Sequence, residues 1–143
     1  MRAARVALAS FSRARPGMRQ SRPQPARPLL PPAYAAFLER FAAGEYWEAH
    51  EVLEGAWRTG RSGFYKGLIL LASAYVHGQR GNAHGVEAQL RKAARELAPY
   101  APFYLGQDVD ALLALARRGP PLPDAPDLTP AIERFRGTEV ELS

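Results

Sequence analysis

The stretch at residues 68–76 is apolar on almost every side of a helix, and it limits the fold more than any other feature of the sequence. A helix of this kind is stable only where neighbouring elements cover several of its faces. The helical pattern extends over residues 64–80, so we expect a long central helix that is the most buried element. Strand-like alternation and internal repeats are lacking. The sequence therefore predicts an all-α fold, a single-domain bundle of about five helices with a buried central third helix.

Four more helices are predicted where apolar residues recur at helical spacing between breaking or capping residues. They cover residues 33–43, 45–58, 83–98 and 108–118. Gly44 is placed to end the first of them, and Asn82 is placed to cap the fourth. After the prolines of residues 120–126, Thr129 and Pro130 predict a last short helix that ends near Arg136.

The formal net charge of +5 is unevenly distributed along the chain. Residues 1–28 hold seven of the 19 basic residues and no acid, which leaves 12 basic residues against all 14 acids in the remainder. The remainder is therefore mildly acidic, and nucleic acid is not its expected partner. We expect a disordered Arg/Pro-rich tail at residues 1–32, a helical bundle at 33–119, and a proline-rich linker with a short helix at 120–143. A misassigned gene start, with Met18 nearer the true beginning, is an alternative account of the tail.

Composition also limits which cellular compartment and which partners we expect for this chain. The chain has no cysteine, which excludes disulfides and thiolate metal sites and suits a cytoplasmic location. No apolar run reaches the roughly 18 residues that span a membrane, so we expect no membrane partner. A homo-oligomer is compatible with a bundle of this size.

The second predicted helix carries polar groups where plain packing would place apolar ones. His50 and Glu54 are four residues apart, so their side chains lie on one stripe of the helix. Trp47 and Trp57 fall beside that stripe and are expected to form an aromatic wall. A buried imidazole and a buried carboxylate both need partners, because each loses strong hydration.

A second polar stripe follows the central helix, which the second helix is expected to contact. It contains Lys66, His77 and Arg80 within about 60° of one another on the helical wheel. Glu51 lies at the edge of the first stripe. We therefore expect one buried polar cluster that comprises His50, Glu51, Glu54, Lys66, His77 and Arg80.

Three strings of residues resemble those of a known family. They are His50-Glu51-Val52-Leu53-Glu54-Gly55-Ala56-Trp57, which reads H-x-x-x-E-x-x-W, Tyr65-Lys66-Gly67-Leu68-Ile69, and His77-Gly78-Gln79-Arg80-Gly81-Asn82. Together they resemble domain of unknown function 309, over roughly residues 33–97. The resemblance implies an all-helical fold. It also implies metal binding by His50 and Glu54, because the motif has been proposed as a metal-binding element, with Trp57 as a packing residue.

Three interpretations of the polar residues remain open. The first, which we favour, is a structural hydrogen-bond network in a binding or scaffold protein. The second is a metal-binding protein or metal-dependent hydrolase, in which His50 and Glu54 bind a divalent metal with a third ligand such as His77 or Glu51. The third is a pocket for a small anionic ligand, lined by Arg80, Lys66 and His77 against the two tryptophans. The sequence does not decide whether the protein is an enzyme.

Overall fold

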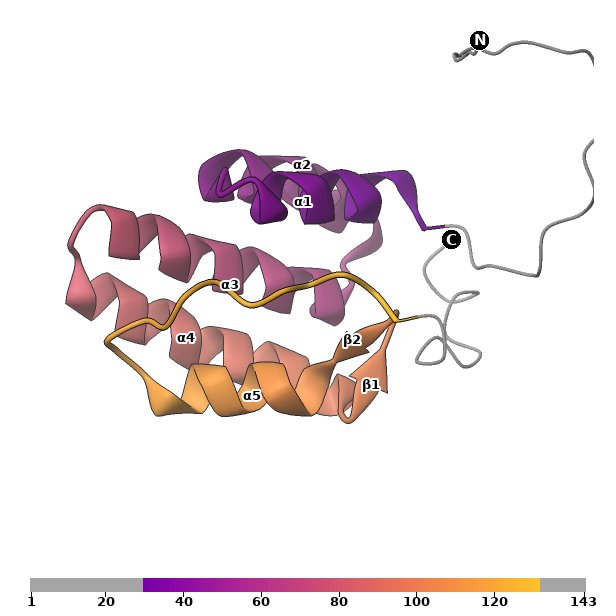
Figure 1. Ribbon diagram of the computed structural model, residues 1–143. Coiled ribbons are helices and arrows are strands. Elements are labelled where there is room, and N and C mark those ends of the chain that lie inside the picture. Colours follow the sequence, from indigo (N-terminus) through magenta and orange to yellow (C-terminus); the bar gives the residue numbers. More distant parts are fainter. Residues whose placement is uncertain (1–29, 132–143) are drawn as a thin grey trace, which may run out of the picture.

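The computed structural model describes residues 30–131, which form five α-helices and one small pair of strands (Figure 1). The helices are α1 (Pro32–Ala42), α2 (Tyr46–Gly60), α3 (Gly63–Gln79), α4 (Ala83–Leu97) and α5 (Val109–Arg118). A 3₁₀ turn, η1 (Ala98–Tyr100), follows α4, and the strands are β1 (Phe103–Tyr104) and β2 (Gln107–Asp108). The predicted all-α bundle is confirmed. Within residues 30–131, no helix is both long enough and apolar enough to cross a membrane.

Helix α3 is the centre of the bundle, as the sequence predicts. It packs against α2 on one side and α4 on the other, while α1 pairs with α2 and α5 with α4 (Figure 1). Phe64, Leu68 and Leu71 have no exposed surface. Close approach to α4 requires Gly67, because a Cβ at this position would lie 2.5 Å from side-chain atoms of Leu97.

The helices begin and end within one or two residues of the predicted positions, at glycines and at residues whose side chains cap them. Gly44 adopts a φ of +79° in the corner between α1 and α2, where a side chain would be strained. The side chains of Ser62, Asn82 and Asp108 cap α3, α4 and α5 by accepting backbone N–H bonds from Tyr65, Gly85 and Ala111. Helix α2 continues to Gly60, and Arg61 follows it with a left-handed φ of 58°.

The prediction that no strand is present is wrong for a short segment before α5. Strands β1 and β2 pair antiparallel, with Tyr104 opposite Gln107. Leu105 and Gly106 form the connection with φ values of 45° and 81°, as a tight two-residue hairpin turn requires. Strands of two residues are too short to produce a detectable alternation in sequence.

The chain after α5 runs back along the bundle, and we call residues 119–131 the C-terminal strap (Figure 1). The sequence predicts a linker here, yet Leu128 is only 6% exposed and belongs to the core. The Tyr75 hydroxyl donates to the Pro123 carbonyl at 3.3 Å, and the Ala131 N–H donates to the Gly106 carbonyl at 3.0 Å. The strap is thus held at both ends.

Two regions of the predicted organisation reach outside the described residues. Residues 1–29, the greater part of the predicted tail, lie there. The short helix predicted at residues 129–136 lies mostly there as well, and its first three residues, 129–131, are not helical.

A buried hydrogen-bond network joins α1 to the hairpin and to the strap. The Tyr34 hydroxyl donates to the Leu105 carbonyl at 2.7 Å and accepts from Gln107 Nε2 at 3.0 Å. Gln107 Nε2 also donates to the Leu128 carbonyl at 2.6 Å. Gln107 is only 3% exposed, so these bonds satisfy an amide that burial would otherwise destabilise.

Leu128→Ala tests whether the strap is part of the folded core. We expect a loss of about 2–3 kcal/mol of unfolding free energy, because the substitution leaves a cavity under the strap. Urea denaturation measures this loss, and Asp124→Ala, at an exposed strap position, is the control. Equal stability of the two variants would show that the strap does not pack as described.

Burial of tyrosines predicts how stability depends on pH in the alkaline range. Burial raises the pKa of the Tyr75 hydroxyl to about 12, and it raises that of Tyr34 still further. A pKa raised in the folded state means that the unfolded chain releases the tyrosine proton at a lower pH than the folded chain does. The contribution of the neutral, buried hydroxyl to the unfolding free energy is therefore complete below about pH 10 and is lost as the pH rises toward 12. The unfolding free energy of Tyr75→Phe should therefore fall less steeply above pH 10 than that of the wild type. Parallel curves in denaturation at stepped pH would contradict the assignment.

Candidate metal centre

Helix α2 divides into a buried face and a polar face, and the polar face carries the candidate site. Ala49 and Leu53 are fully buried against the bundle. The side chains of His50 and Glu54 are partly exposed, at 18% and 29%, and that of Glu51 is 51% exposed. The first two share one side of the helix because they are four residues apart. The sequence predicts that these three residues are buried. In the structure His50 and Glu54 are only partly buried, and Glu51 faces solvent.

The three side chains bring donor atoms together on a single turn of α2. One ligand atom from each of His50, Glu51 and Glu54 lies within 4.8 Å of the others. Nδ1 of His50 is 3.3 Å from Oε2 of Glu51. Two ligands of one tetrahedral zinc ion, bound at about 2.0–2.1 Å, are separated by about the same distance. The group therefore fits a small divalent ion after modest side-chain rotation.

Nδ1 of His50 is the buried atom of this group. It has almost no accessible surface and no hydrogen-bond partner among residues 30–131, since its contact with Glu51 has the distance but not the angles of a hydrogen bond. A buried ring nitrogen without a partner loses the hydration it has in water. A bound cation is one way to satisfy it.

Trp47 orients the imidazole of His50. The two rings stack with centroids 5.2 Å apart and an interplanar angle of 12°. Trp47 is 50% exposed, the most exposed large apolar side chain that the structure describes. Stacking restricts the rotation of the His50 ring and keeps Nδ1 beside Glu51.

Arg58 is the ion-pair partner of Glu54. Its guanidinium lies 3.6 Å from Oε2 of Glu54, one helical turn further along α2. Both side chains belong to one helix, so this ion pair does not tie α2 to a neighbour. Arg58 is not part of the predicted polar cluster, although a Glu four residues before an Arg on a helix is a recognisable pairing signal.

Lys66 of α3 contacts Trp57 near the C-terminal end of α2. It does not pair with Glu54. The Lys66 ammonium lies 4.4 Å from the centroid of the Trp57 ring, and the Arg61 guanidinium lies 4.5 Å from it. These are cation–π contacts, and the sequence had placed Lys66 in a polar cluster with His50, Glu51 and Glu54 instead. Trp47 and Trp57 thus engage different groups, His50 on one hand and two cations on the other, and do not form one aromatic wall.

His77 and Arg80 lie near the far end of α3. Nδ1 of His77 is 3.2 Å from the Asn82 amide nitrogen, and Arg80 is exposed. Eleven residues separate Lys66 from His77, which is about 16 Å along a helix. The expectation of one buried cluster with Arg80 is therefore wrong, and Lys66, His77 and Arg80 do not line one anion pocket.

One family model matches the part of the chain that contains this group. The family model named Domain of unknown function (DUF309) matches residues 34–88. The resemblance found from the three strings is confirmed for this segment. The DUF309 segment contains almost all of α1, the whole of α2 and α3, and the first part of α4, so it includes His50, Glu51 and Glu54. Helix α5 and the C-terminal strap lie beyond it. Neither the curated proteins nor the solved structures include a significant match to this chain.

Proposed function

We propose that this protein binds a divalent metal ion through His50, Glu51 and Glu54 on α2. The observation that carries the proposal is the convergence of one donor atom each from His50, Glu51 and Glu54 within 4.8 Å of one another, together with a buried Nδ1 of His50 that finds no hydrogen-bond partner among residues 30–131. One imidazole and two carboxylates are ligands that zinc, manganese and iron accept.

The contacts of His50 and Glu54 favour a metal site over a structural network. A structural network would join α2 to another helix through hydrogen bonds. Within the described part of the chain, His50 Nδ1 has no such bond, and Glu54 pairs with Arg58 of its own helix. A buried network that does join distant elements is the separate one around Tyr34 and Gln107.

Three ligands from one helix leave coordination positions open, so the bound ion keeps water or accepts a ligand from another molecule. The function proposed is binding. Hydrolysis needs a proton acceptor beside the bound water. In this arrangement Glu51 and Glu54 are both used as ligands.

Direct metal analysis tests the proposal. Untagged protein purified without chelator should bind about one zinc or manganese ion per chain, as measured by native mass spectrometry and calorimetric titration. His50→Ala and Glu54→Gln should each weaken binding by more than about tenfold, because even residues that only support a ligand contribute about 10- to 100-fold. Circular dichroism should show that both variants stay folded, since the group lies on the outer face of α2.

Glu48→Gln is the matched control for charge. It removes one carboxylate from the same helix at an exposed position outside the group, and it should leave metal affinity unchanged. Equal metal affinity of wild type, His50→Ala and Glu54→Gln would refute the site.

Arg58→Gln should strengthen binding, in contrast to the ligand variants. It frees Glu54 from a competing cation while leaving all three donors in place. An exposed ion pair of this kind is worth up to about 1 kcal/mol, so affinity should rise by about two- to fivefold. The same calorimetric titration measures the change, and a decrease in affinity would argue that Arg58 supports the site instead of competing with it.

A further inference from the structure

Helices α4 and α5 pack side by side and leave a hollow between them where α5 ends and the C-terminal strap begins (Figure 1). It is lined by one side of α4 within residues 87–94 and by residues 116–120, and we call it the α4–α5 hollow. Its volume is about 630 Å³, within the roughly 300–1,000 Å³ of small-molecule sites. None of its lining residues belongs to α2, so it is separate from the proposed metal site.

Three arginines line the α4–α5 hollow, and they come from two helices. Arg91 belongs to α4, whereas Arg117 and Arg118 are the last residues of α5. The carboxylate in the lining is that of Glu87, which lies 3.3 Å from the Arg91 guanidinium. Three positive charges less one negative charge leave a net charge of +2 around the hollow.

The groups around the two arginines of α5 do not neutralise them. Neither Arg117 nor Arg118 has an ion-pair partner among residues 30–131. Asp124 of the strap raises the pKa of the Tyr75 hydroxyl and Arg118 lowers it, so both lie within electrostatic range of that hydroxyl, yet they do not pair with each other.

The helix dipole explains only part of this arrangement. Basic residues in the last turn of a helix face the negative end of its dipole, which accounts for Arg117 and Arg118. It does not account for Arg91, which α4 brings to the same hollow although like charges repel. An anion between the two helices would remove this repulsion.

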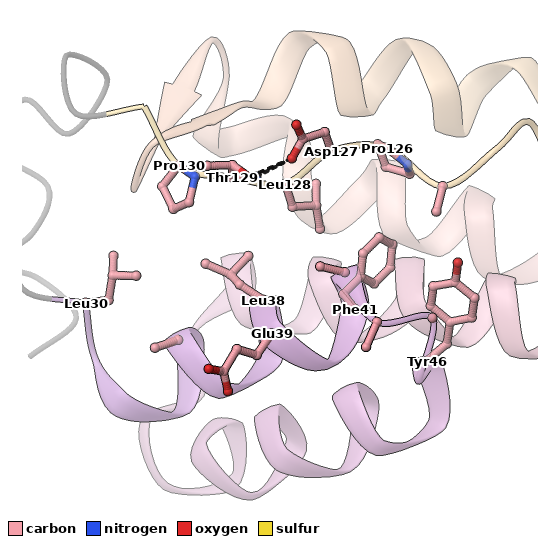
Figure 2. Close-up of a pocket in the computed structure, with 15 residues that line it drawn as sticks. Leu30, Leu38, Glu39, Phe41, Tyr46, Pro126, Asp127, Leu128, Thr129 and Pro130 are labelled. Carbon is pink, nitrogen blue, oxygen red and sulfur yellow. Dashed lines mark hydrogen bonds between the residues drawn. The ribbon is translucent and has the colours of Figure 1, made fainter. Parts of the chain in front are cut away.

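The groove between α1 and the C-terminal strap lacks such a convergence of charge (Figure 2). Glu39 and Asp127 line it, but their carboxylates point away from the groove and from each other. The Asp127 carboxylate accepts from the Thr129 hydroxyl at 2.7 Å. Of these two cavities, the α4–α5 hollow is therefore the one suited to a charged ligand.

The net charge of the lining selects a phosphate over a carboxylate. A phosphate monoester carries a charge of about −1.5 to −2 near pH 7 and three acceptor oxygens, whereas a carboxylate carries a single charge. Arginine guanidiniums bind phosphate oxygens through paired hydrogen bonds. Ala94, Ala116 and Pro120 add apolar surface beside the arginines, which suits the organic part of such an ester.

We propose that the α4–α5 hollow binds the phosphate group of a small organic phosphate monoester through Arg91, Arg117 and Arg118. Phenyl phosphate is the probe that tests this in the full chain, in a buffer free of phosphate. It should shift the amide NMR signals of residues 87–94 and 116–119 until they saturate, and leave those of residues 49–54 unchanged.

Substitutions in the lining should change the affinity in opposite directions. Arg91→Gln and Arg117→Gln should each weaken binding by about fivefold or more, because each removes charge-assisted hydrogen bonds to the phosphate. Glu87→Gln should strengthen binding by about twofold or more, because it removes a carboxylate that repels the phosphate and pairs with Arg91. These positions are exposed, so circular dichroism should show that all three variants keep the wild-type helix content.

Arg95→Gln is the matched control, because it removes one arginine from an exposed position of α4 outside the lining. It should leave the affinity unchanged. Equal losses for Arg95→Gln and Arg91→Gln would show that net charge alone attracts the probe and would overturn the proposal. Absence of saturable shifts in residues 87–94 and 116–119 would overturn it as well. Benzoate that binds as tightly as phenyl phosphate would equally overturn it, since the hollow would then not select a phosphate.

Discussion

The burial of α3 is the constraint on which the rest of this structure depends. Because the helix has no wide polar face, neighbouring elements must cover it on several sides. Helices α2 and α4 cover two sides. Tyr75, only 4% exposed, packs against Phe41 and Tyr46 from the α1–α2 corner and donates a hydrogen bond to Pro123 of the strap. The strap is thus a structural part of the bundle.

The position of α2 at the edge of the bundle explains why it can carry a site. One face, with Ala49 and Leu53, supplies packing, and the opposite face is free of that role. His50, Glu51 and Glu54 therefore approach one another without a fold-stabilising bond to any neighbouring helix among residues 30–131. Side chains placed in this way can be changed with little effect on the core, so the proposed metal binding can be tested separately from the stability of the fold.

Most of the fold could be predicted from the sequence because its helices are specified locally. Capping side chains such as Asn82 and Asp108, and glycine at the positive φ of Gly44, mark helix ends through contacts within a few residues. The hairpin and the strap depend instead on distant partners. Tyr34 and Gln107 are 73 residues apart, and the pattern of residues around neither of them predicts their hydrogen bond.

The sequence by itself determined that His50 and Glu54 share one side of a helix, because side chains four residues apart are neighbours in any α-helix. It also determined that α3 would be central, because an apolar helix must be covered. Only the tertiary structure decided which neighbour each polar side chain meets. Lys66 lies over Trp57 and Arg80 is exposed, although the helical wheel groups both with the polar stripe of α3. Periodicity fixes which residues share a face, whereas the packing of helices fixes what that face contacts.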